Sequence, residues 1–150
     1  MEARLDYAKL APEAMRALYS LGAYLAKCGL ERPLLELVKI RASQINGCAY
    51  CIDMHTKDAR AIGETEQRIY ALPAWPETPY FSARERAALA FTESVTLLAR
   101  DHVPTEAYDA VAAQFTPDEI AALVSLIVTI NAWNTIGVST RAWTAGSYEP

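Results

Sequence analysis

Two cysteines and a histidine have the spacing of a reactive group on one face of a helix. Cys48 and Cys51 are three residues apart, and His55 follows four residues after Cys51. At about 100° of rotation per residue, their side chains share one narrow helix face. The preceding Asn46 and Gly47 are expected to end an earlier helix, which would place both cysteines in the first turn of a new one.

The start of a helix favours the ionised form of a thiol. Its first N–H groups lack intrahelical partners and concentrate partial positive charge there. A Cys-x-x-Cys pair in this position commonly has one thiol with a pKa well below the ~8.5 of free cysteine. Because the thiolate attacks disulfides and peroxides, Cys48 and Cys51 indicate redox chemistry. His55, one turn later, is a candidate general base or proton shuttle, since imidazole titrates near neutral pH.

Two other interpretations of these residues stay open. Cys48, Cys51 and His55 could bind zinc, but a structural zinc site normally takes four ligands. The other free candidates, Cys28 and His102, are far away in sequence. Both cysteines could also be small core residues, because free cysteine is often buried and inert. The residues alone favour a redox dithiol over a zinc site or a core pair.

The role of Glu36 cannot be decided from its spacing. It lies twelve residues before Cys48, and a straight helix of that length spans ~18 Å. Only a turn at Asn46 and Gly47 with a favourable helix crossing, or another subunit, could bring its carboxylate to the thiols.

Several other polar and aromatic residues are expected to be structural. Cys28 is interpreted as a core or incidental residue and His102 as solvent-facing. Buried amides need hydrogen-bond partners, so Asn131 and Asn134 in an apolar segment are assigned a structural role. Packing roles are predicted for Tyr19, Tyr24, Trp133 and Trp143.

Composition favours one soluble domain over residues 1–150. The chain is 52% apolar, slightly rich for a monomer, so another subunit is expected to cover some of its surface. Its net charge of −4 provides no excess of positive charge that would attract nucleic acid or an anionic membrane. The N-terminal MEARLDYAKL does not resemble a signal peptide, which favours the cytoplasm. A thiol pair in that reducing compartment is more often catalytic or metal-binding than structural.

The hydrophobic pattern predicts an all-α chain. Capping boxes at Ser82 and Thr116 begin two of the helices. Residues 73–79 hold three prolines and are expected to form a linker without regular structure. The most apolar run, 120–138, is interrupted by polar residues, which indicates a buried helix rather than a membrane span. Helices are predicted over 12–28, 33–46, 48–63, 64–72, 82–100, 104–115 and 116–143.

The region around the cysteines resembles the signature of the alkylhydroperoxidase AhpD-like family, within the carboxymuconolactone decarboxylase superfamily. Glu36, Cys48, Cys51 and His55 have the spacing of that signature. Further residues match its common form RxSxxNxCxYCxxxHxxxxRxxG, namely Arg41, Ser43, Asn46, Tyr50, Arg60 and Gly63, and Gly47 stands at the variable position between Asn46 and Cys48.

The resemblance implies a bundle of about six to seven helices that assembles into homotrimers or homohexamers. It also implies thiol-dependent reduction of organic hydroperoxides or hydrogen peroxide, without haem or metal. By position, Cys51 would attack the peroxide and Cys48 would resolve the sulfenic acid to a disulfide. His55 and Glu36 would form the proton relay, and a dithiol of the lipoyl or thioredoxin kind would restore the thiols.

The chain departs from the best-studied peroxidase branch at Tyr50, where that branch has a histidine. A phenol with a pKa near ~10 donates hydrogen bonds but does not share protons at neutral pH as imidazole does. The decarboxylase branch generally lacks the paired cysteines. The alternatives are therefore a carboxymuconolactone decarboxylase-like enzyme acting on aromatic-degradation intermediates, and a redox- or zinc-sensing module.

Overall fold

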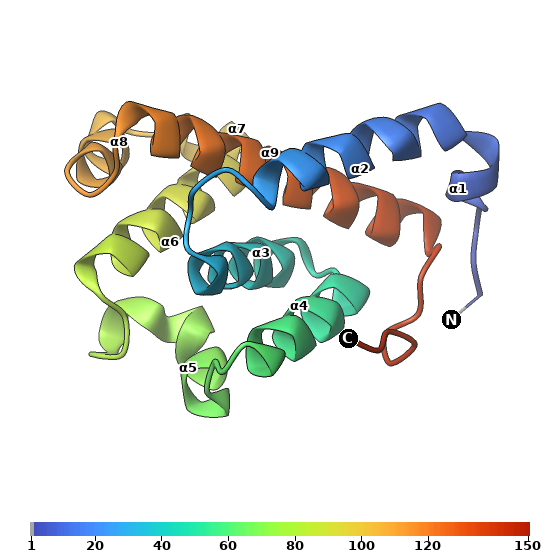
Figure 1. The fold of residues 1–150 in the computed structure, drawn as a ribbon, viewed down its shortest axis with the longest axis horizontal. Coiled ribbons are helices and arrows are strands. Elements are labelled where there is room, and N and C mark those ends of the chain that lie inside the picture. The colour runs from blue at the N-terminus through green and yellow to red at the C-terminus, as the bar shows by residue number, and fades with distance from the viewer. Residues whose placement is uncertain (1) are drawn as a thin grey trace.

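The chain forms helices and no strand within residues 2–150, the part that the computed structural model describes. The all-α prediction is confirmed. Two four-residue helices, α1 and α7, add to the predicted number (Figure 1). The elements are α1 (Tyr7–Leu10), α2 (Pro12–Leu25), α3 (Arg32–Asn46), α4 (Ala49–Ala61), α5 (Glu66–Ala71), the 3-10 helix η1 (Leu72–Glu77), α6 (Ala83–Thr96), α7 (Leu98–Asp101), α8 (Thr105–Ala112) and α9 (Pro117–Thr140).

Helix α3 lies at the centre of the fold, because apolar residues occupy several of its sides. It packs against α4, α6 and α9 (Figure 1). Leu37, Val38 and Ile40 are fully buried, and burial of each such side chain contributes about 1.5–3 kcal/mol. Val38 belongs to a hydrophobic cluster with α6, α8 and α9, while Leu37 and Ile40 belong to a second cluster with α4, α5, η1 and α6.

The predicted break at Asn46 and Gly47 is confirmed. Gly47 adopts the left-handed conformation, with φ +68°. The Cys48 N–H donates to the Ser43 carbonyl at 3.0 Å, which closes the last turn of α3. The Cys48 sulfur then accepts the Cys51 N–H at 3.4 Å as the N-cap of α4. One residue therefore ends α3 and begins α4, and α4 folds back against α3.

Helix α9 is the longest helix among the described residues and closes the core. Thr116 and Glu119 form the predicted capping box. Among the described helices, α9 alone is long and apolar enough to cross a membrane by length and composition, but Leu123 and Ile127 are buried in the protein core. It ends at Thr140, three residues before the predicted end.

The prediction that residues 73–79 lack regular structure is wrong. Residues 73–77 belong to η1 (Leu72–Glu77), and Trp75 is buried. A proline in the first turn of a helix loses no hydrogen bond, since that N–H has no partner there. The Trp75 indole donates to Glu93 at 2.7 Å, and the Arg86 guanidinium donates to three carbonyls of the segment.

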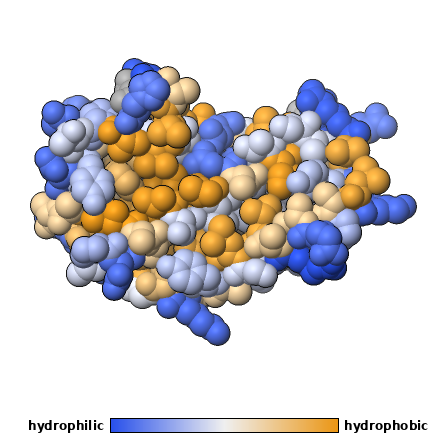
Figure 2. Space-filling model, turned by 90° about the horizontal axis from the view of Figure 1, so that it is seen from above, coloured by the Kyte–Doolittle hydropathy of each residue, from blue (hydrophilic) through white to orange (hydrophobic). Residues whose placement is uncertain are grey.

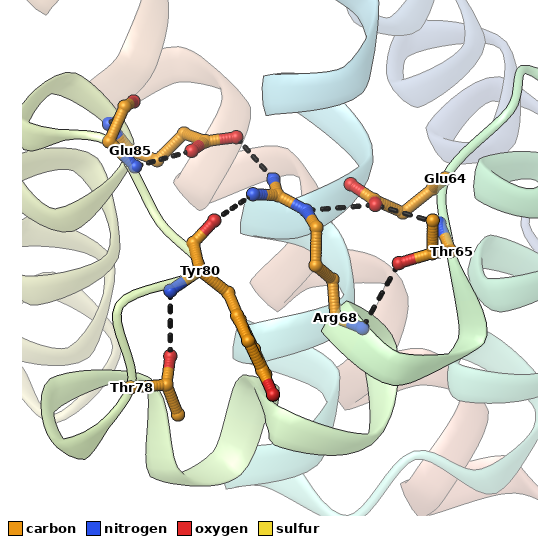
Figure 3. Close-up of polar contacts among 7 residues, drawn as sticks. Glu64, Thr65, Arg68, Thr78, Tyr80 and Glu85 are labelled. Atoms are coloured by element: carbon orange, nitrogen blue, oxygen red, sulfur yellow. Dashed lines mark hydrogen bonds and ion pairs between the residues drawn. The ribbon is translucent and has the colours of Figure 1, made fainter.

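Arg68 fastens α5 to the start of α6 (Figure 3). Its guanidinium donates to Glu64 at 2.9 Å, to Glu85 at 2.5 Å and to the Tyr80 carbonyl. Glu85 also accepts the Ser82 N–H at 2.7 Å, which completes the predicted capping box of α6. The segment between η1 and α6 is thus held by charged hydrogen bonds.

One face of α9 is apolar although no other element of the described chain covers it. Val124, Val128 and Val138 are 37%, 53% and 46% exposed. Figure 2 looks onto the side that carries α2, α8 and α9 and shows apolar residues gathered there. Helix α9 therefore presents apolar side chains both to the core and to the surface.

Replacing Gly47 should test how strongly the turn before α4 stabilises the fold. No atom lies within 4 Å of a Cβ placed on Gly47, so Gly47→Ala changes the backbone conformation and little else. A left-handed alanine costs about 1–2 kcal/mol. We expect urea denaturation to give an unfolding free energy lower by that amount.

The matched control is Gly22→Ala in α2, where a Cβ also meets no atom within 4 Å. Alanine in a helix interior should raise the unfolding free energy by roughly 0.5–1 kcal/mol. A fall in both variants would contradict the role assigned to the left-handed turn.

Candidate active site

Cys48 and Cys51 form a disulfide at the N-terminus of α4. Their Cα atoms are 5.3 Å apart, within the usual range for bonded cysteines. Both side chains are 2% exposed. The N-cap and the third residue of a helix face the same side, which is why the local fold brings the two sulfurs together. The structure therefore shows the oxidised form of the predicted dithiol.

The fold brings Glu36 to His55, which the spacing had left undecided. The Oε2 atom of Glu36 lies 2.9 Å from Nδ1 of His55, and both side chains are buried. The turn at Gly47 accounts for this contact, because α4 returns along α3 toward Glu36. His55 is one helical turn after Cys51, so the carboxylate, the imidazole and the sulfur follow one another along the helix pair.

Lys39, which is half-buried, is a third member of this ionic group. Its ammonium donates to Oε1 of Glu36 at 2.7 Å. Burial raises the pKa of Glu36, but the hydrogen bond to His55 and the charge of Lys39 outweigh it, so the pKa lies below its ordinary value. An ionised carboxylate only accepts hydrogen bonds. Nδ1 of His55 is therefore the donor, which leaves Nε2 able to take or give a proton.

A pocket of about 740 Å³ lies against this group. Its walls come from α2, α3, α4, α9 and the C-terminal segment, and Glu36, Cys51 and His55 line it. Cys48 is not among the lining residues. A Cβ on Gly137 would meet the Cys48 sulfur at 3.3 Å and the Trp143 ring at 3.4 Å, so that sulfur lies against α9. The two sulfurs therefore differ in access to the pocket.

Four aromatic side chains form a row along the pocket. The ring centroids of Tyr19 and Trp133 are 5.3 Å apart, those of Trp133 and Trp143 5.8 Å, and those of Trp143 and Tyr50 5.6 Å. Tyr19 packs against Trp133, as predicted, but Tyr19 is 63% and Tyr24 49% exposed, so neither tyrosine is a core residue. Tyrosine suits such a position, since it combines an apolar ring with a polar tip.

The segment after α9 is bound to α4 and holds Trp143 at the pocket. The Gly146 N–H donates to Asp53 at 2.9 Å, and the Tyr148 hydroxyl donates to Asp58 at 2.8 Å. The second bond raises the pKa of Tyr148 to about 12. Figure 1 shows the chain end beside α4. Trp143 was predicted inside the last helix, but it belongs to this segment.

The asparagines join the end of α3 to α9. The Asn46 amide donates to Asn131 at 2.7 Å and to Asn134 at 3.0 Å. Asn134 in turn donates to the buried hydroxyl of Ser43 at 3.0 Å. The predicted structural role of Asn131 and Asn134 is confirmed, and their contacts fix the position of the turn that carries the cysteines.

The zinc interpretation lacks its fourth ligand in the described part of the chain. Cys28 is half-buried and packs against the hydrophobic cluster beside α2, which fits its interpretation as a core residue. His102 is exposed at the end of α7, as predicted. Neither residue joins Cys48, Cys51 and His55 in a group of potential metal ligands.

A different set of potential ligands exists within the described residues. Ligand atoms of Glu36, His55 and Asp58 lie within 4.8 Å of one another. Lys39 already neutralises Glu36, and Asp58 accepts a hydrogen bond from the Tyr148 hydroxyl. An ammonium ion this close opposes a second cation, so the arrangement suits proton transfer better than metal binding.

Comparison with known proteins places this site in a family. Residues 12–94, more than half of the chain, match the Carboxymuconolactone decarboxylase family. The chain belongs to this family. The match includes the helices that carry Glu36, both cysteines of the disulfide and His55, and the structural similarities below make the chain an AhpD-like member.

Two relatives and one protein of similar fold show how far the similarity extends. The uncharacterized protein YdfG of Bacillus subtilis is 45% identical over 139 residues, covering 93% of this chain and 95% of YdfG. A protein from Agrobacterium tumefaciens, proposed to be an antioxidant defence protein AhpD, superposes with a TM-score of 0.90 at 40% identity and 99% coverage of both chains. The debrominase Bmp8 shares the fold alone, with a TM-score of 0.77, 17% identity, and coverage of 90% of this chain and 73% of Bmp8.

Sequence reasoning missed several residues of this family member's site. Lys39 could have been found, because it is three residues after Glu36 and thus on the same helix face. Trp143 and Tyr148 could not, since their approach to α4 depends on where α9 ends. Tyr19 lies in α2, and no sequence pattern connects α2 with the cysteines.

The pH dependence of stability should reveal the contribution of Lys39. The pKa of Glu36 is lower in the folded protein than in the unfolded one. Its stabilisation is therefore complete above the unfolded pKa of about 4.3 and is lost as the pH falls through the folded pKa. Lys39→Met should be less stable at neutral pH and should lose less unfolding free energy on acidification. Urea denaturation across that range measures both.

Lys39→Arg keeps the charge and is the control for this experiment. It should follow the pH profile of the unmodified protein. Other carboxylates titrate equally in all three proteins, so the difference between profiles isolates Glu36. Identical profiles for the methionine and arginine variants would contradict the electrostatic role of Lys39.

Proposed function

We propose that this protein is a thiol peroxidase, an antioxidant oxidoreductase that reduces organic hydroperoxides or hydrogen peroxide through a Cys48–Cys51 dithiol–disulfide cycle. One observation carries the proposal: a bonded cysteine pair has one sulfur on a large pocket, beside the buried pair of His55 and Glu36. The whole chain, residues 1–150, would act as one AhpD-like domain.

In the first step, the Cys51 thiolate attacks the outer oxygen of the hydroperoxide. A sulfur–oxygen bond forms, the oxygen–oxygen bond breaks, and the sulfur is oxidised by two electrons. His55 protonates the leaving alkoxide, which departs as an alcohol, or as water when the substrate is hydrogen peroxide. The position of Cys51 on the pocket supports its role as the attacking thiol.

In the second step, the Cys48 thiolate attacks the sulfenic sulfur of Cys51. The sulfur–sulfur bond forms, and the hydroxyl group leaves with a proton as water. The Cα separation of 5.3 Å supports this step, because the helix start already permits the bond. A dithiol of the lipoyl or thioredoxin kind then supplies two electrons and two protons and is itself oxidised to a disulfide.

Proton transfer in this scheme is assigned to His55 and Glu36. Glu36 holds Nδ1 and stabilises the imidazolium, while Nε2 exchanges the proton with the thiol and the leaving group. Tyr50 does not replace the histidine of the best-studied branch. Burial and the neighbouring Tyr19 and Asp53 raise the pKa of Tyr50, so it stays protonated and acts as a hydrogen-bond donor.

The family match favours one second candidate, a carboxymuconolactone decarboxylase-like enzyme acting on aromatic-degradation intermediates. In that case His55 would act as the acid or base, and the thiols would be incidental. Alkylation of both cysteines separates the two proposals. Full activity on a lactone acid after alkylation would favour the decarboxylase, whereas loss of peroxide consumption favours the peroxidase.

We also propose that the protein is a cytoplasmic homo-oligomer, a trimer or hexamer. The exposed valines of α9 support this, because solvent-facing apolar residues along a core helix are typical of a subunit contact. The composition supports it as well, since apolar residues make up 52% of the chain.

Cysteine variants should separate the two sulfur roles. Cys51→Ser should abolish peroxide consumption, while Cys48→Ser should react once and stop as a sulfenic acid. Mass spectrometry of the intact reduced protein after peroxide treatment measures these products. The unmodified protein should lose two hydrogens, reversibly with dithiothreitol, and Cys48→Ser should gain one oxygen.

Cys28→Ser is the control, because it makes the same chemical change at a cysteine that does not line the pocket, and it should behave like the unmodified protein. A retained rate in Cys51→Ser would exclude Cys51 as the attacking thiol.

Variants of the relay should slow the reaction without unfolding the protein. His55→Gln and Glu36→Gln should each reduce the rate of peroxide reduction by about 10²-fold or more, the usual contribution of general acid–base catalysis. Stopped-flow kinetics on the reduced protein measures the rate, and alkylation by iodoacetamide at several pH values measures the thiolate fraction.

Glu64→Gln is the matched control, because Glu64 pairs with Arg68 and does not line the pocket. Its rate should stay within a few-fold of the unmodified protein. Equal losses in Glu36→Gln and Glu64→Gln would assign the effect to general destabilisation.

A further inference from the structure

The pocket is much larger than the smallest peroxides require. Its volume is about 740 Å³, against about 30 Å³ for a water molecule in the liquid. Hydrogen peroxide would fill a small part of it. Its walls include Leu18, Leu35, Leu126 and Ile130, and apolar walls of this extent are typical of sites for small organic molecules.

The aromatic row forms one side of this space. Tyr19 comes from α2, Tyr50 from α4, Trp133 from α9 and Trp143 from the C-terminal segment, and all four line the pocket. Four separate elements thus contribute rings to one continuous surface. Tyr19 is mostly exposed, so core packing alone does not explain the row. Neighbouring rings are tilted by 32–59° to one another, so the surface suits an unsaturated chain that can bend along it.

Arg32 supplies a positive charge at the other end of the pocket. It is the first residue of α3 and lines the same cavity. The other cations and anions of the lining neutralise each other, since Lys39 is paired with Glu36. Arg32 has no acidic partner in the described part of the chain. A guanidinium binds a carboxylate through two parallel hydrogen bonds.

The helix pair places Arg32 and Cys51 on opposite sides of the Glu36–His55 contact. Arg32 is one turn before Glu36 on α3, and Cys51 is one turn before His55 on α4, which returns along α3. Each turn rises about 5.4 Å, so the two residues are separated by roughly 11–12 Å along the helices. A ligand that reaches both must carry its two polar groups far apart.

We infer that the preferred substrate is the hydroperoxide of a long unsaturated carboxylic acid. Its carboxylate binds Arg32, its unsaturated chain lies along the aromatic row, and its peroxide group reaches Cys51. The separation along the helices favours a chain over a single ring. This inference rests on the proposed peroxidase function and adds the substrate class to it.

The kinetic test compares four substrates of the dithiothreitol-reduced protein: hydrogen peroxide, cumene hydroperoxide, linoleic acid hydroperoxide and its methyl ester. We expect kcat/KM for the acid to exceed that for the ester by about tenfold or more, as expected for a charge-assisted hydrogen-bonded pair. Arg32→Gln should lower kcat/KM for the acid to the level of the ester and should lower kcat/KM for hydrogen peroxide by a much smaller factor. Arg16→Gln, at an exposed arginine of α2 that is not itself a lining residue, should change neither value.

Equal values for acid and ester in the unmodified protein would overturn the inference while leaving the peroxidase proposal intact. So would a loss in Arg32→Gln that is as large for hydrogen peroxide as for the acid. A higher kcat/KM for cumene hydroperoxide than for the acid would also overturn the inference, because it would show that the pocket prefers a compact neutral substrate to a long-chain acid.

A binding measurement keeps the two proposals separate if no peroxide is consumed. Linoleate and methyl linoleate, each below its aggregation concentration, are titrated against the tryptophan fluorescence of the protein, in which Trp133 and Trp143 line the pocket and the buried Trp75 does not. Linoleate should bind about tenfold more tightly than the ester, and Arg32→Gln should remove that difference. Equal binding of the two probes would overturn the carboxylate site whatever the outcome for peroxidase activity.

Discussion

The hydrogen bond from the Cys48 N–H to the Ser43 carbonyl, made possible by the left-handed Gly47, is the constraint on which the site depends. It reverses the chain between α3 and α4 within two residues. A longer connection would let α4 slide or rotate, and the 2.9 Å contact of Glu36 with His55 would not be fixed. Cys48 supplies both a sulfur of the disulfide and the N-cap of α4. The backbone turn and the chemistry therefore cannot vary independently.

Burial of charge is the main energetic cost of this arrangement, and it is offset locally. A buried carboxylate without a partner would protonate or destabilise the fold by several kcal/mol. Glu36 instead has two partners, His55 and Lys39, and its pKa falls although burial alone would raise it. The imidazole is held in one tautomer by the carboxylate. A proton acceptor is thus positioned one helical turn from Cys51, and the charge of the Glu36 carboxylate beside it is balanced by Lys39.

Local features were predictable from the sequence, and contacts between distant segments were not. Capping boxes such as that of Thr116 depend on residues three apart, and the break at Gly47 depends on a conformation that glycine adopts easily. The region around Trp75 was misjudged, because a 3-10 helix tolerates prolines that a longer helix excludes. The placement of Glu36 beside His55 depends on a helix crossing, and that of Trp143 on the end of α9. No local pattern encodes either.

The two sulfurs show how access and electrostatics compete within the proposed cycle. The N-cap position favours a lower pKa for Cys48 than for Cys51. A difference of one pKa unit changes the thiolate fraction by at most about tenfold, and the nucleophilicity of a thiolate falls as its pKa falls, which offsets part of that gain. Access distinguishes the two sulfurs more sharply, because Cys51 lines the pocket, whereas Cys48 does not and its sulfur lies against α9 at Gly137. Access therefore outweighs the helix dipole and favours Cys51 as the attacking thiol.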